Sequence, residues 1–306
     1  MRELVSVCVI SFNSSGTVVE TLESIKKQTY KNIELIISDD CSTDNTVSVI
    51  SNWIQVNKNC GLNDIKLVTH EKNGGTCKNL NDGIRASSGK WIKILAADDM
   101  LVADAIENFV LFSNQQNCHF SICNCNILCD SLELKEKLEQ TYRYFFNTVK
   151  YPFKKKQKKI LFEYTYPGPC YFFSREMYDS IKGFDERYDL AEEWPFVFHA
   201  IKCGYDIKAL DKKLVDYRFQ SFSLSHSILI SSRLLNGNIL FYNQERKPAL
   251  IKKRMFLRVL HQNYMYYLLK KYNGKRICVL LKYLSPFSLA ERVAYYLGSK
   301  KKGFEN

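Results

Sequence analysis

Residues 5–46 read VSVCVISFNSSGTVVETLESIKKQTYKNIELIISDDCSTDNT, and the order of patterns in this stretch decides the fold. Two short runs rich in β-branched residues, 5–11 and 33–38, are typical of buried strands. Between them, after a polar turn, apolar residues recur at helical spacing from residue 18 to residue 25. A strand, an amphipathic helix and a second strand in this order predict a parallel sheet covered by helices.

The same alternation extends outward from this stretch. The next helix is expected to follow Ser42 and Thr43, either of which can cap it. Further elements are expected in this order: a strand at residues 65–69, a helix at 75–86, a strand at 91–95, a helix at 102–112, a strand at 120–128, a strand at 170–173 and a helix at 190–203. Residues 150–159 contain six lysines and are interpreted as a mobile solvated loop, with closure over an anionic donor as the alternative.

Polar side chains follow four of the expected strands at the point where each strand ends. They are Ser11, Phe12 and Asn13, then Asp39 and Asp40, then Asn73 and Gly74, and finally Asp98 and Asp99. In open α/β sheets ligands bind outside the carboxyl ends of the strands, where loops and helix N-termini supply unpaired backbone donors. We therefore expect one shared crevice. The fingerprints G-x-G-x-x-G and G-x-x-x-x-G-K-[ST] are absent, which disfavours a conventional NAD enzyme or a P-loop NTPase.

Two of these strand ends carry paired carboxylates. Asp98 and Asp99 suit a magnesium or manganese ion, which takes one or two protein carboxylates together with diphosphate oxygens and water. The alternative is that an aspartate caps the helix that follows. Asp39 or Asp40 can accept hydrogen bonds from a base or a ribose, and helix capping is again the alternative.

The stretch 5–46, followed by NGGTCKNLNDGIRASSGKWIKILAADDML at residues 73–101, resembles the family 2 glycosyltransferases with the GT-A fold, particularly those of capsular and lipopolysaccharide assembly. The resemblance is strong over residues 4–101 and returns in GFDERYDLAEEWPF at residues 183–196. It implies an α/β fold in which helices flank a mostly parallel twisted sheet and a nucleotide-diphospho-sugar binds. A basic helical extension is expected at the C-terminal side of this domain.

The resemblance also implies roles for single residues. Those matched to nucleotide binding are Ser11, Phe12, Asn13, Asp39, Asp40, Asn73, Lys78 and Asp98. Asp99 matches the metal-coordinating end of the family's DxD element, and Ala97 replaces the usual first acid of that element. The implied cofactor is Mn²⁺ or Mg²⁺. Arg218, in the later segment DYRFQSFSLS, is a candidate contact for the diphosphate.

Glu192 and Glu193 match the acidic pair whose second member, commonly aspartate, is the general base in this family. An acceptor sugar hydroxyl is a weak nucleophile, and a carboxylate within about 2.6–3.2 Å can take its proton as the new bond forms. One base on the face opposite the leaving nucleotide implies inversion at the anomeric carbon. Glu193 is the predicted base and Glu192 the alternative. Without the resemblance, the pair equally suits the first turn of a helix, whose dipole favours carboxylates.

The net charge of +12 is concentrated toward the C-terminus. Residues 227–306 carry 16 basic and 3 acidic residues, interleaved with apolar and aromatic ones. Such segments can lie on an anionic bilayer surface, which would suit a lipid-linked acceptor. A helical cap with a solvated basic face is an equal alternative. Nucleic acid is not expected as a partner, because no nucleic-acid motif accompanies the charge.

Eleven cysteines occur without a framework spacing, and no leader with a small-residue cleavage site is recognised. We interpret them as reduced thiols of a cytoplasmic protein. Cys123, Cys125 and Cys129 form one loose cluster, whereas a zinc site usually needs two paired groups of ligands. No apolar run reaches the roughly 18 to 20 residues that span a bilayer, so a membrane would be contacted from one side only.

The sequence thus predicts a metal-dependent, inverting glycosyltransferase that moves a sugar from a nucleotide sugar, UDP-linked by default, to a bacterial surface glycan or lipid-linked acceptor. Residues 1–101 would bind the nucleotide sugar and residues 102–226 the acceptor. Residues 227–306 would form the basic extension, with 228–302 on the inner face of the cell membrane. The alternatives are a sugar nucleotidyltransferase, which normally has a cationic loop after its first strand, and a degenerate family member acting as a glycan or membrane scaffold.

Overall fold

The computed structural model describes residues 3–164, 166–188, 190–219 and 231–273. The chain divides into two compact units, Met1–Gln220 and Ser221–Asn306. All the strands described belong to the first unit, and the described part of the second unit is helical.

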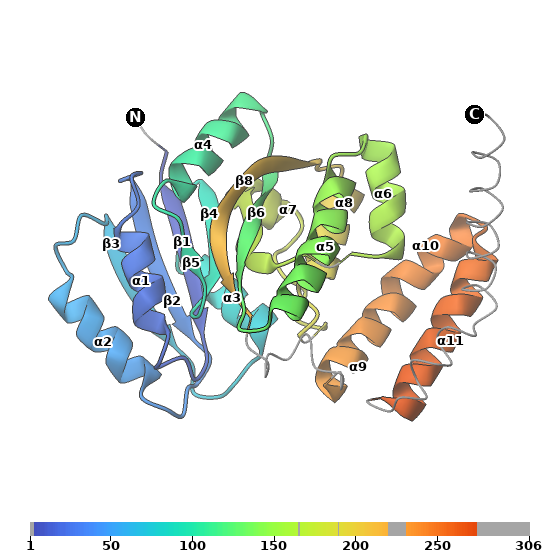
Figure 1. Ribbon diagram of the computed structural model, residues 1–306, viewed down its shortest axis with the longest axis horizontal. Coiled ribbons are helices and arrows are strands. Elements are labelled where there is room, and N and C mark those ends of the chain that lie inside the picture. Colours follow the sequence, from blue (N-terminus) through green and yellow to red (C-terminus); the bar gives the residue numbers. More distant parts are fainter. Residues whose placement is uncertain (1–2, 165, 189, 220–230, 274–306) are drawn as a thin grey trace. The chain divides into compact units, whose positions relative to one another are not determined.

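A mixed eight-stranded sheet forms the centre of the first unit, as far as the described residues go (Figure 1). Its strands are β1 (Val5–Ser11), β2 (Ile33–Asp39), β3 (Asp64–Thr69), β4 (Trp91–Ala96), β5 (Met100–Leu101), β6 (Phe120–Leu128), β7 (Tyr171–Ser174) and β8 (Ile207–Arg218). They lie in the order β3-β2-β1-β4-β7-β6-β8-β5. The first four of this order are mutually parallel, and β6 is parallel to β8. Strand β7 runs antiparallel to both of its neighbours, and β5 runs antiparallel to β8.

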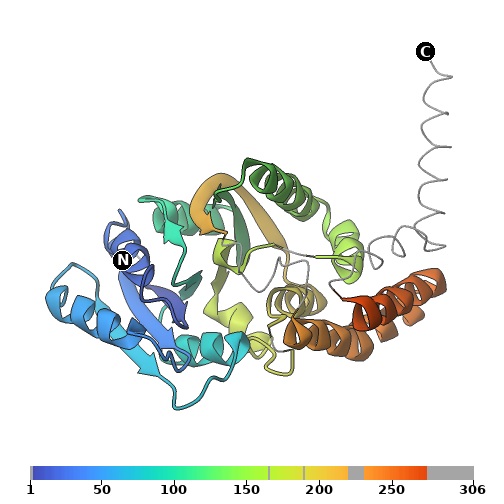
Figure 2. The same cartoon turned by 60° about the horizontal axis from the view of Figure 1, so that its bottom comes forward.

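Helices flank this sheet, as predicted. Those of the first unit are α1 (Val18–Lys26), α2 (Thr46–Val56), α3 (Thr76–Arg85), α4 (Ala105–Gln115), α5 (Leu132–Val149), α6 (Phe153–Phe162), α7 (Arg175–Ser180) and α8 (Glu193–Lys202), with the 3-10 turn η1 (Gly168–Cys170). Helices α1, α4 and α5 lie on one face of the sheet, and α3 and α7 lie on the other (Figures 1 and 2). Helix α1 buries Val18, Leu22 and Ile25, the apolar residues whose spacing predicted a helix there.

The carboxyl ends of the parallel strands lie abreast. Ser11 of β1 is in register with Asp39 of β2, and Asp39 with Thr69 of β3. On the other side of β1, Ile10 is in register with Ala96, the last residue of β4. The predicted convergence of these strand ends at one edge of the sheet is therefore confirmed.

Aromatic side chains fill the core around the antiparallel strand β7. The ring of Phe172 stacks on Trp91 of β4 at 5.2 Å and on Phe109 of α4 at 4.9 Å, measured between ring centroids. The next residue, Phe173, lies 4.9 Å from the ring of Phe196 in α8. Because successive side chains of a strand point to opposite faces, these two residues attach helices to both sides of the sheet.

The prediction of a mobile loop at residues 150–159 is wrong. Most of this run belongs to helix α6. Lys156 is buried, and its Nζ donates to Asp206 Oδ1 and to the carbonyl oxygen of Ile207, each at 2.5 Å. The loop prediction relied on the number of lysines alone. It overlooked the helical spacing of Phe153, Lys156 and Ile160, which form the inward face of α6.

The predicted caps of helix α2 are also wrong. The helix begins at Thr46, and neither Ser42 nor Thr43 caps it. Asp44 Oδ1 instead accepts a hydrogen bond from the backbone N–H of Thr46 at 2.9 Å. Ser42 instead donates two hydrogen bonds to Asp39, the last residue of β2.

The second unit is helical over residues 231–273, which agrees with the predicted helical extension. Its elements are α9 (Ser232–Phe241), the π-helical turn η2 (Tyr242–Arg246), α10 (Lys247–Lys252) and α11 (Phe256–Tyr272). The Tyr242 hydroxyl donates to the carbonyl oxygen of Val259 at 3.2 Å and so joins η2 to α11. The rest of the predicted extension, residues 227–230 and 274–306, lies outside the described residues.

Two sequence expectations concern membranes and thiols. None of the helices in the described ranges has both the length and the apolar character needed to cross a bilayer. Ten cysteines fall in those ranges, and all ten are free thiols. Cys123 and Cys125 are buried and Cys129 is partly buried.

Candidate active site

Asp39 ends strand β2 and binds both neighbouring segments. Its Oδ2 accepts hydrogen bonds from Ser11 Oγ at 2.7 Å and from Ser42 Oγ at 2.6 Å. Its Oδ1 accepts a third from the backbone N–H of Ser42 at 2.8 Å. This buried carboxylate therefore fixes the end of β1 against the loop that follows β2.

The residues after β1 present an exposed aromatic ring beside this loop. Asn13 has a φ of 51°, and its Oδ1 accepts a hydrogen bond from the backbone N–H of Thr43 at 2.8 Å. Phe12, between Ser11 and Asn13, is 48% exposed. An exposed ring beside polar side chains offers a stacking surface to a planar base.

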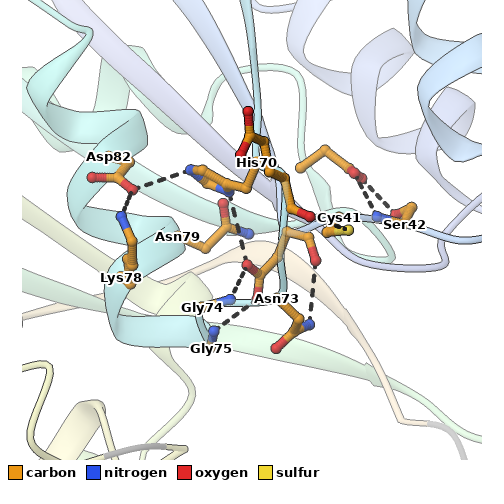
Figure 3. A network of polar contacts seen from close by, with 12 residues as sticks. Cys41, Ser42, His70, Asn73, Gly74, Gly75, Lys78, Asn79 and Asp82 are labelled. Atoms are coloured by element: carbon orange, nitrogen blue, oxygen red, sulfur yellow. Dashed lines mark hydrogen bonds and ion pairs between the residues drawn. The ribbon is translucent and has the colours of Figure 1, made fainter.

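Asp40 holds the loop that leads into helix α3 (Figure 3). Its two carboxylate oxygens accept from the backbone N–H groups of Gly74 at 2.7 Å and Gly75 at 2.9 Å. Its carbonyl oxygen accepts from Asn73 Nδ2 at 3.2 Å. Gly75 has a φ of 85°, a conformation that favours glycine. Asp40 therefore holds residues 73–75 at the same edge of the sheet as Ser11 and Asp39.

His70 extends this network to helix α3 (Figure 3). Its Nδ1 is 3.8 Å from Asp40 Oδ1, and its Nε2 is 3.1 Å from Asp82 Oδ2. The Lys78 ammonium also pairs with Asp82, one helical turn away. The structure thus places Lys78 near the expected crevice but pairs it with a carboxylate. Its contact with a nucleotide stays a prediction.

Asp98 and Asp99 lie at the turn after β4, where the end of β8 contacts them. The backbone N–H of Arg218 donates to Asp99 Oδ1 at 2.8 Å, and its Nε donates to the carbonyl oxygen of Asp98 at 3.0 Å. The guanidinium also pairs with Glu20 of α1. Asp99 and Arg218 are therefore in contact although they are nearly 120 positions apart in the sequence. Their predicted roles, metal binding for Asp99 and a diphosphate contact for Arg218, both need this proximity.

The two aspartates form an acidic centre in which Asp99 is buried and Asp98 is partly buried. Burial, followed by the charge of Asp98, raises the pKa of Asp99 well above its usual range. Burial also raises the pKa of Asp98, and Arg218 opposes this effect. Asp99 Oδ2 is buried and accepts no hydrogen bond from the described residues. A carboxylate in this state fits a divalent cation, whose charge offsets the cost of burying the ionised acids.

The donor set at this centre is small. Among the residues described, no group of three or more His, Cys, Asp or Glu side chains is placed to hold a metal ion. Magnesium and manganese at nucleotide sites commonly use one or two protein carboxylates, with phosphate and water oxygens as the remaining ligands. Asp99, with Asp98 beside it, matches that limited protein contribution.

Glu193 begins helix α8, and Glu192 is the N-cap residue of the same helix. Burial, followed by the charge of Glu192, raises the pKa of Glu193 to about 8. The nearby backbone N–H of Gly168 in η1 acts in the opposite direction and lowers this pKa. A carboxyl group with its pKa in this range can accept a proton near neutral or mildly alkaline pH, as a general base must.

Tyr217 lies within electrostatic range of both acidic centres. Burial raises the pKa of its hydroxyl well above the usual value, and the charges of Tyr142, Asp99 and Glu193 add to the shift. Both carboxylates therefore lie within electrostatic range of one hydroxyl group. The ring of Tyr142 in α5 lies 6.1 Å from the ring of Tyr217. Asp99 and Glu193 thus belong to one region of the first unit rather than to unrelated surfaces.

Sequence reasoning missed the tyrosines around Glu193. Its charge, together with burial, raises the hydroxyl pKa of four of them: Tyr142, Tyr164, Tyr171 and Tyr217. They come from α5, from the segment before η1, from β7 and from β8, so no spacing in the sequence groups them. The one available signal was the aromatic, proline-rich segment at residues 164–171, which reads simply as a turn entering a strand.

Comparison with known families decides the identity of the fold. The model described as Glycosyl transferase family 2 matches residues 6–182. The chain belongs to this family. The matched span includes Asp39, Asp40 and Asp99 but ends before Glu193, so the predicted general base is not part of the match.

Curated relatives match part of the chain. A glucosyltransferase of Escherichia coli, named UDP-Glc:alpha-D-GlcNAc-diphosphoundecaprenol beta-1,3-glucosyltransferase WfaP, is 35% identical over 124 residues, which are 40% of this chain and 46% of the relative. Glycosyltransferase GlyG of Streptococcus pneumoniae is 36% identical over 107 residues, 35% of this chain and 34% of the relative. The chain therefore spans less than half the length of each of these two relatives.

Solved structures share the fold. Staphylococcus aureus TarS, residues 1–349, in complex with UDP-GlcNAc superposes with a TM-score of 0.58 at 18% identity, covering 81% of this chain and 75% of that one. Mannosyltransferase PcManGT of Pyrobaculum calidifontis, in complex with GDP-Man and Mn²⁺, gives a TM-score of 0.56 at 20% identity, covering 71% and 57%. At these identities the likeness concerns the fold alone, and the predicted GT-A fold is confirmed.

Proposed function

We propose that the protein transfers a sugar from a UDP-sugar to a saccharide acceptor that is lipid-linked or part of a surface glycan. The observation that carries this proposal is that the Asp98–Asp99 pair and Glu193 all lie within electrostatic range of the Tyr217 hydroxyl. Relatives support the substrate classes: the name of WfaP specifies UDP-glucose and a diphosphoundecaprenol acceptor, and TarS was solved with UDP-GlcNAc.

The donor would bind across the strand ends. Phe12 is exposed and would stack on the base. Asp39 and Asp40 would accept hydrogen bonds from base or ribose with lone pairs not used by Ser11, Ser42 and the Gly74–Gly75 amides. Arg218, already beside the aspartates, contacts the diphosphate. A Mn²⁺ or Mg²⁺ ion held by Asp99, with Asp98 next to it, would neutralise charge on the diphosphate leaving group.

Glu193 would serve as the general base. Its carboxylate takes the proton from the acceptor hydroxyl while that oxygen forms a bond to the anomeric carbon. The bond from that carbon to the diphosphate oxygen breaks, and the nucleotide diphosphate leaves with the electron pair. Attack from the side opposite the leaving group inverts the configuration of the anomeric carbon. The Gly168 N–H orients the carboxyl group for this step.

The replacement Asp99→Ala tests the donor site. Because Asp99 Oδ2 is the buried oxygen left to bind a cation, we expect Mn²⁺-dependent binding of a UDP-sugar to weaken at least about tenfold in isothermal titration calorimetry. Asp130→Ala is the matched control, since Asp130 is exposed and lies outside this centre. Unchanged Mn²⁺-dependent binding in the Asp99 variant would remove the metal assignment.

Transfer itself needs a separate measurement. The native protein should release UDP from at least one common UDP-sugar when a diphosphoundecaprenol-linked saccharide is present, with Mn²⁺ or Mg²⁺ in the buffer. A protein that binds UDP-sugars but turns over none of them with any such acceptor contradicts the proposed activity and favours the scaffold alternative.

We further propose that a surface of the second unit contacts anionic lipid at the cytoplasmic face of the membrane. Residues 251–260, which join α10 to α11, are named here the basic–apolar corner. Its apolar members are Ile251, Phe256, Leu257 and Leu260, which are 45%, 57%, 72% and 64% exposed. Its exposed cations are Lys252, Lys253 and Arg254. Apolar side chains that enter a bilayer interface beside cations that meet lipid phosphates are the pattern of an interfacial segment.

A further inference from the structure

Lys93 is a buried ammonium group in the middle of strand β4. Lys93 is 0% exposed. Its Nζ donates to the carbonyl oxygens of Ile94 at 2.8 Å and Tyr171 at 3.3 Å, and also to that of Pro169. It also lies 5.6 Å from the centroid of the Phe109 ring. All of its hydrogen-bond partners in the described chain are uncharged carbonyl groups.

Burying the Lys93 ammonium group in this way destabilises the folded state. A buried cation is costly unless a carboxylate pairs with it, and Lys93 forms no such ion pair with a described residue. Burial accordingly lowers the pKa of Lys93 to about 8. The other side chains of β4 that are buried are apolar, so a Met or Leu would satisfy the packing at this position. Local violations of the packing rules are expected at functional sites.

The carbonyl partners of Lys93 identify what it holds. Pro169 belongs to the turn η1, and Tyr171 is the first residue of β7. Gly168, one residue before Pro169, packs against the Glu193 side chain, and its backbone N–H lowers the pKa of the Glu193 carboxyl group. A Cβ built on Gly168 would lie 3.7 Å from Glu193 Cγ and 3.6 Å from Ile94 Cδ1, so the turn is packed directly between β4 and the glutamate.

We propose that Lys93 is a positioning residue for Glu193: its ammonium group fixes the turn at residues 168–170, and the Gly168 N–H at the start of that turn sets the place and orientation of the Glu193 carboxyl group. This inference rests on the proposed role of Glu193 as the general base. It adds a link from β4, the strand that leads to Asp98 and Asp99, to the acid on the acceptor side.

Several charged and titratable groups lie near Lys93 and near Glu193. Lys93 is within electrostatic range of Cys123, Cys170 and Asp99. Glu193 has Glu192 as its charged neighbour, and the nearby hydroxyls are those of Tyr142, Tyr164, Tyr171 and Tyr217. Lys93 therefore acts on Glu193 through the turn rather than by direct charge contact.

The replacement Lys93→Met tests the proposal, because methionine fills a similar volume without charge or N–H donors. We expect the melting temperature to stay the same or rise, since replacing a buried charge by an apolar group is often neutral or stabilising. UDP affinity should change less than about twofold, whereas kcat should fall at least about tenfold. The acidic limb of the kcat–pH profile should move to higher pH, because the Gly168 bond that favours the ionised carboxylate is loosened.

A second pair of variants keeps the proposal testable if Lys93→Met fails to fold. Gly168 is the first residue of η1, and Pro167 before it has φ −57° and ψ 126°, a conformation compatible with a following proline. Gly168→Pro removes the N–H donor and puts the ring Cδ where the N–H pointed, so it should displace the Glu193 carboxyl group. The proline variant should reproduce the loss of kcat and the shift in pH profile. Lys90→Met, at the exposed lysine just before β4, is the control and should keep both near the native values.

One readout does not depend on catalysis. The titration of the Glu193 carboxyl group can be followed by carbon-13 NMR, with Glu193→Gln identifying the signal. Its midpoint should rise in Lys93→Met and Gly168→Pro but not in Lys90→Met. An unchanged midpoint and kcat in both Lys93→Met and Gly168→Pro would overturn the inference. A native protein that transfers no sugar contradicts the proposed function instead, while the NMR titration still decides whether Lys93 positions Glu193.

Discussion

Glu193 shows how one side chain joins stability to activity. Its pKa in the folded protein, raised to about 8 chiefly by burial, lies above the value of about 4.3 expected in an unfolded chain. The folded state therefore binds the proton more tightly than the unfolded state. The resulting stabilisation is complete below the unfolded pKa and is lost as pH rises through the folded pKa. The same deprotonation that destabilises the fold generates the proposed base.

The replacement Glu193→Gln should separate these two effects. We expect kcat to fall by about 10²–10⁴-fold, the usual contribution of a general base, while UDP-sugar affinity stays nearly constant. In the native protein kcat/KM should rise with pH with a midpoint near 8. The Gln variant should be more stable than the native protein above pH 8 in thermal unfolding, because it has no carboxyl group to ionise.

Glu192→Gln is the matched control for that experiment. Glu192 precedes Glu193 and is the N-cap of the same helix, so it shares the location but not the predicted role. Removing its charge should lower the pKa of Glu193 and move the activity midpoint to lower pH. A fully active Glu193 variant together with an inactive Glu192 variant would exchange the two assignments.

At this scale, sequence patterns located acids but not their partners. Asp39, Asp40, Asp98 and Asp99 stand at strand ends, a position that follows from counting strands. The bonds from Asp40 to the Gly74 and Gly75 amides depend on the path of a loop. The buried place of Lys93 depends on the antiparallel entry of β7. Neither feature can be predicted from the sequence, because both depend on how distant segments of the chain pack in three dimensions.

Among the elements, α3 is joined to the segment before α8 by one buried amide. The side chain of Asn81 donates to the carbonyl oxygen of Phe184 and to Glu186 Oε1, both at 2.8 Å. Its Oδ1 accepts from the Tyr178 hydroxyl at 2.8 Å and from the backbone N–H of Phe184 at 2.9 Å. These bonds tie a helix that contacts β1 and β2 to the segment that carries the chain toward Glu193.

The replacement Asn81→Ala should therefore cost stability. It leaves buried donors and acceptors of the 178–184 segment without partners, and we expect a loss of about 2–4 kcal/mol in the free energy of unfolding, measured in urea. Asn52→Ala, an exposed site in α2, is the control and should change stability by less than about 0.5 kcal/mol. Equal losses in the two variants would contradict the bridging role of Asn81.

Periodicity predicted elements well in the first hundred residues and less well beyond them. The parallel strands and α1 to α3 repeat one pattern, in which local spacing and long-range packing agree. The lysine run of α6 misled charge counting because one lysine of the run, Lys156, is buried against Asp206. The two-residue strand β5 is too short to leave a pattern, and it pairs with residues 215 and 216, more than a hundred positions away.

For the molecule as a whole, the concentration of positive charge in residues 227–306 is the feature that bears on location. In the described part of this unit the exposed cations of the basic–apolar corner lie next to exposed apolar side chains. A cation near an anionic bilayer contributes on the order of 1 kcal/mol, so charge alone gives binding that salt weakens. Apolar insertion adds a contribution that salt does not screen.

The double replacement Phe256→Glu with Leu257→Glu should reduce partitioning onto phosphatidylglycerol-containing vesicles at least about tenfold in a sedimentation assay. Both side chains are exposed, so the helical unit should keep its fold, which circular dichroism can verify. Val56→Glu with Leu132→Glu is the control pair, because these residues are 84% and 78% exposed but belong to the first unit. Absence of vesicle binding by the native protein would leave the helical-cap interpretation of the tail.

The network around Asp40 has a thermodynamic consequence for ligand recognition. The amides of Gly74 and Gly75 are hydrogen-bonded to Asp40, and the Ser42 side chain is hydrogen-bonded to Asp39, so these loops are held by bonds within the chain (Figure 3). The conformational entropy of ordering these loops is thus lost when the chain folds, and little of it is left to lose when a nucleotide arrives. If the proposed nucleotide binds at these strand ends, its recognition there should accordingly be closer to lock-and-key than to induced fit.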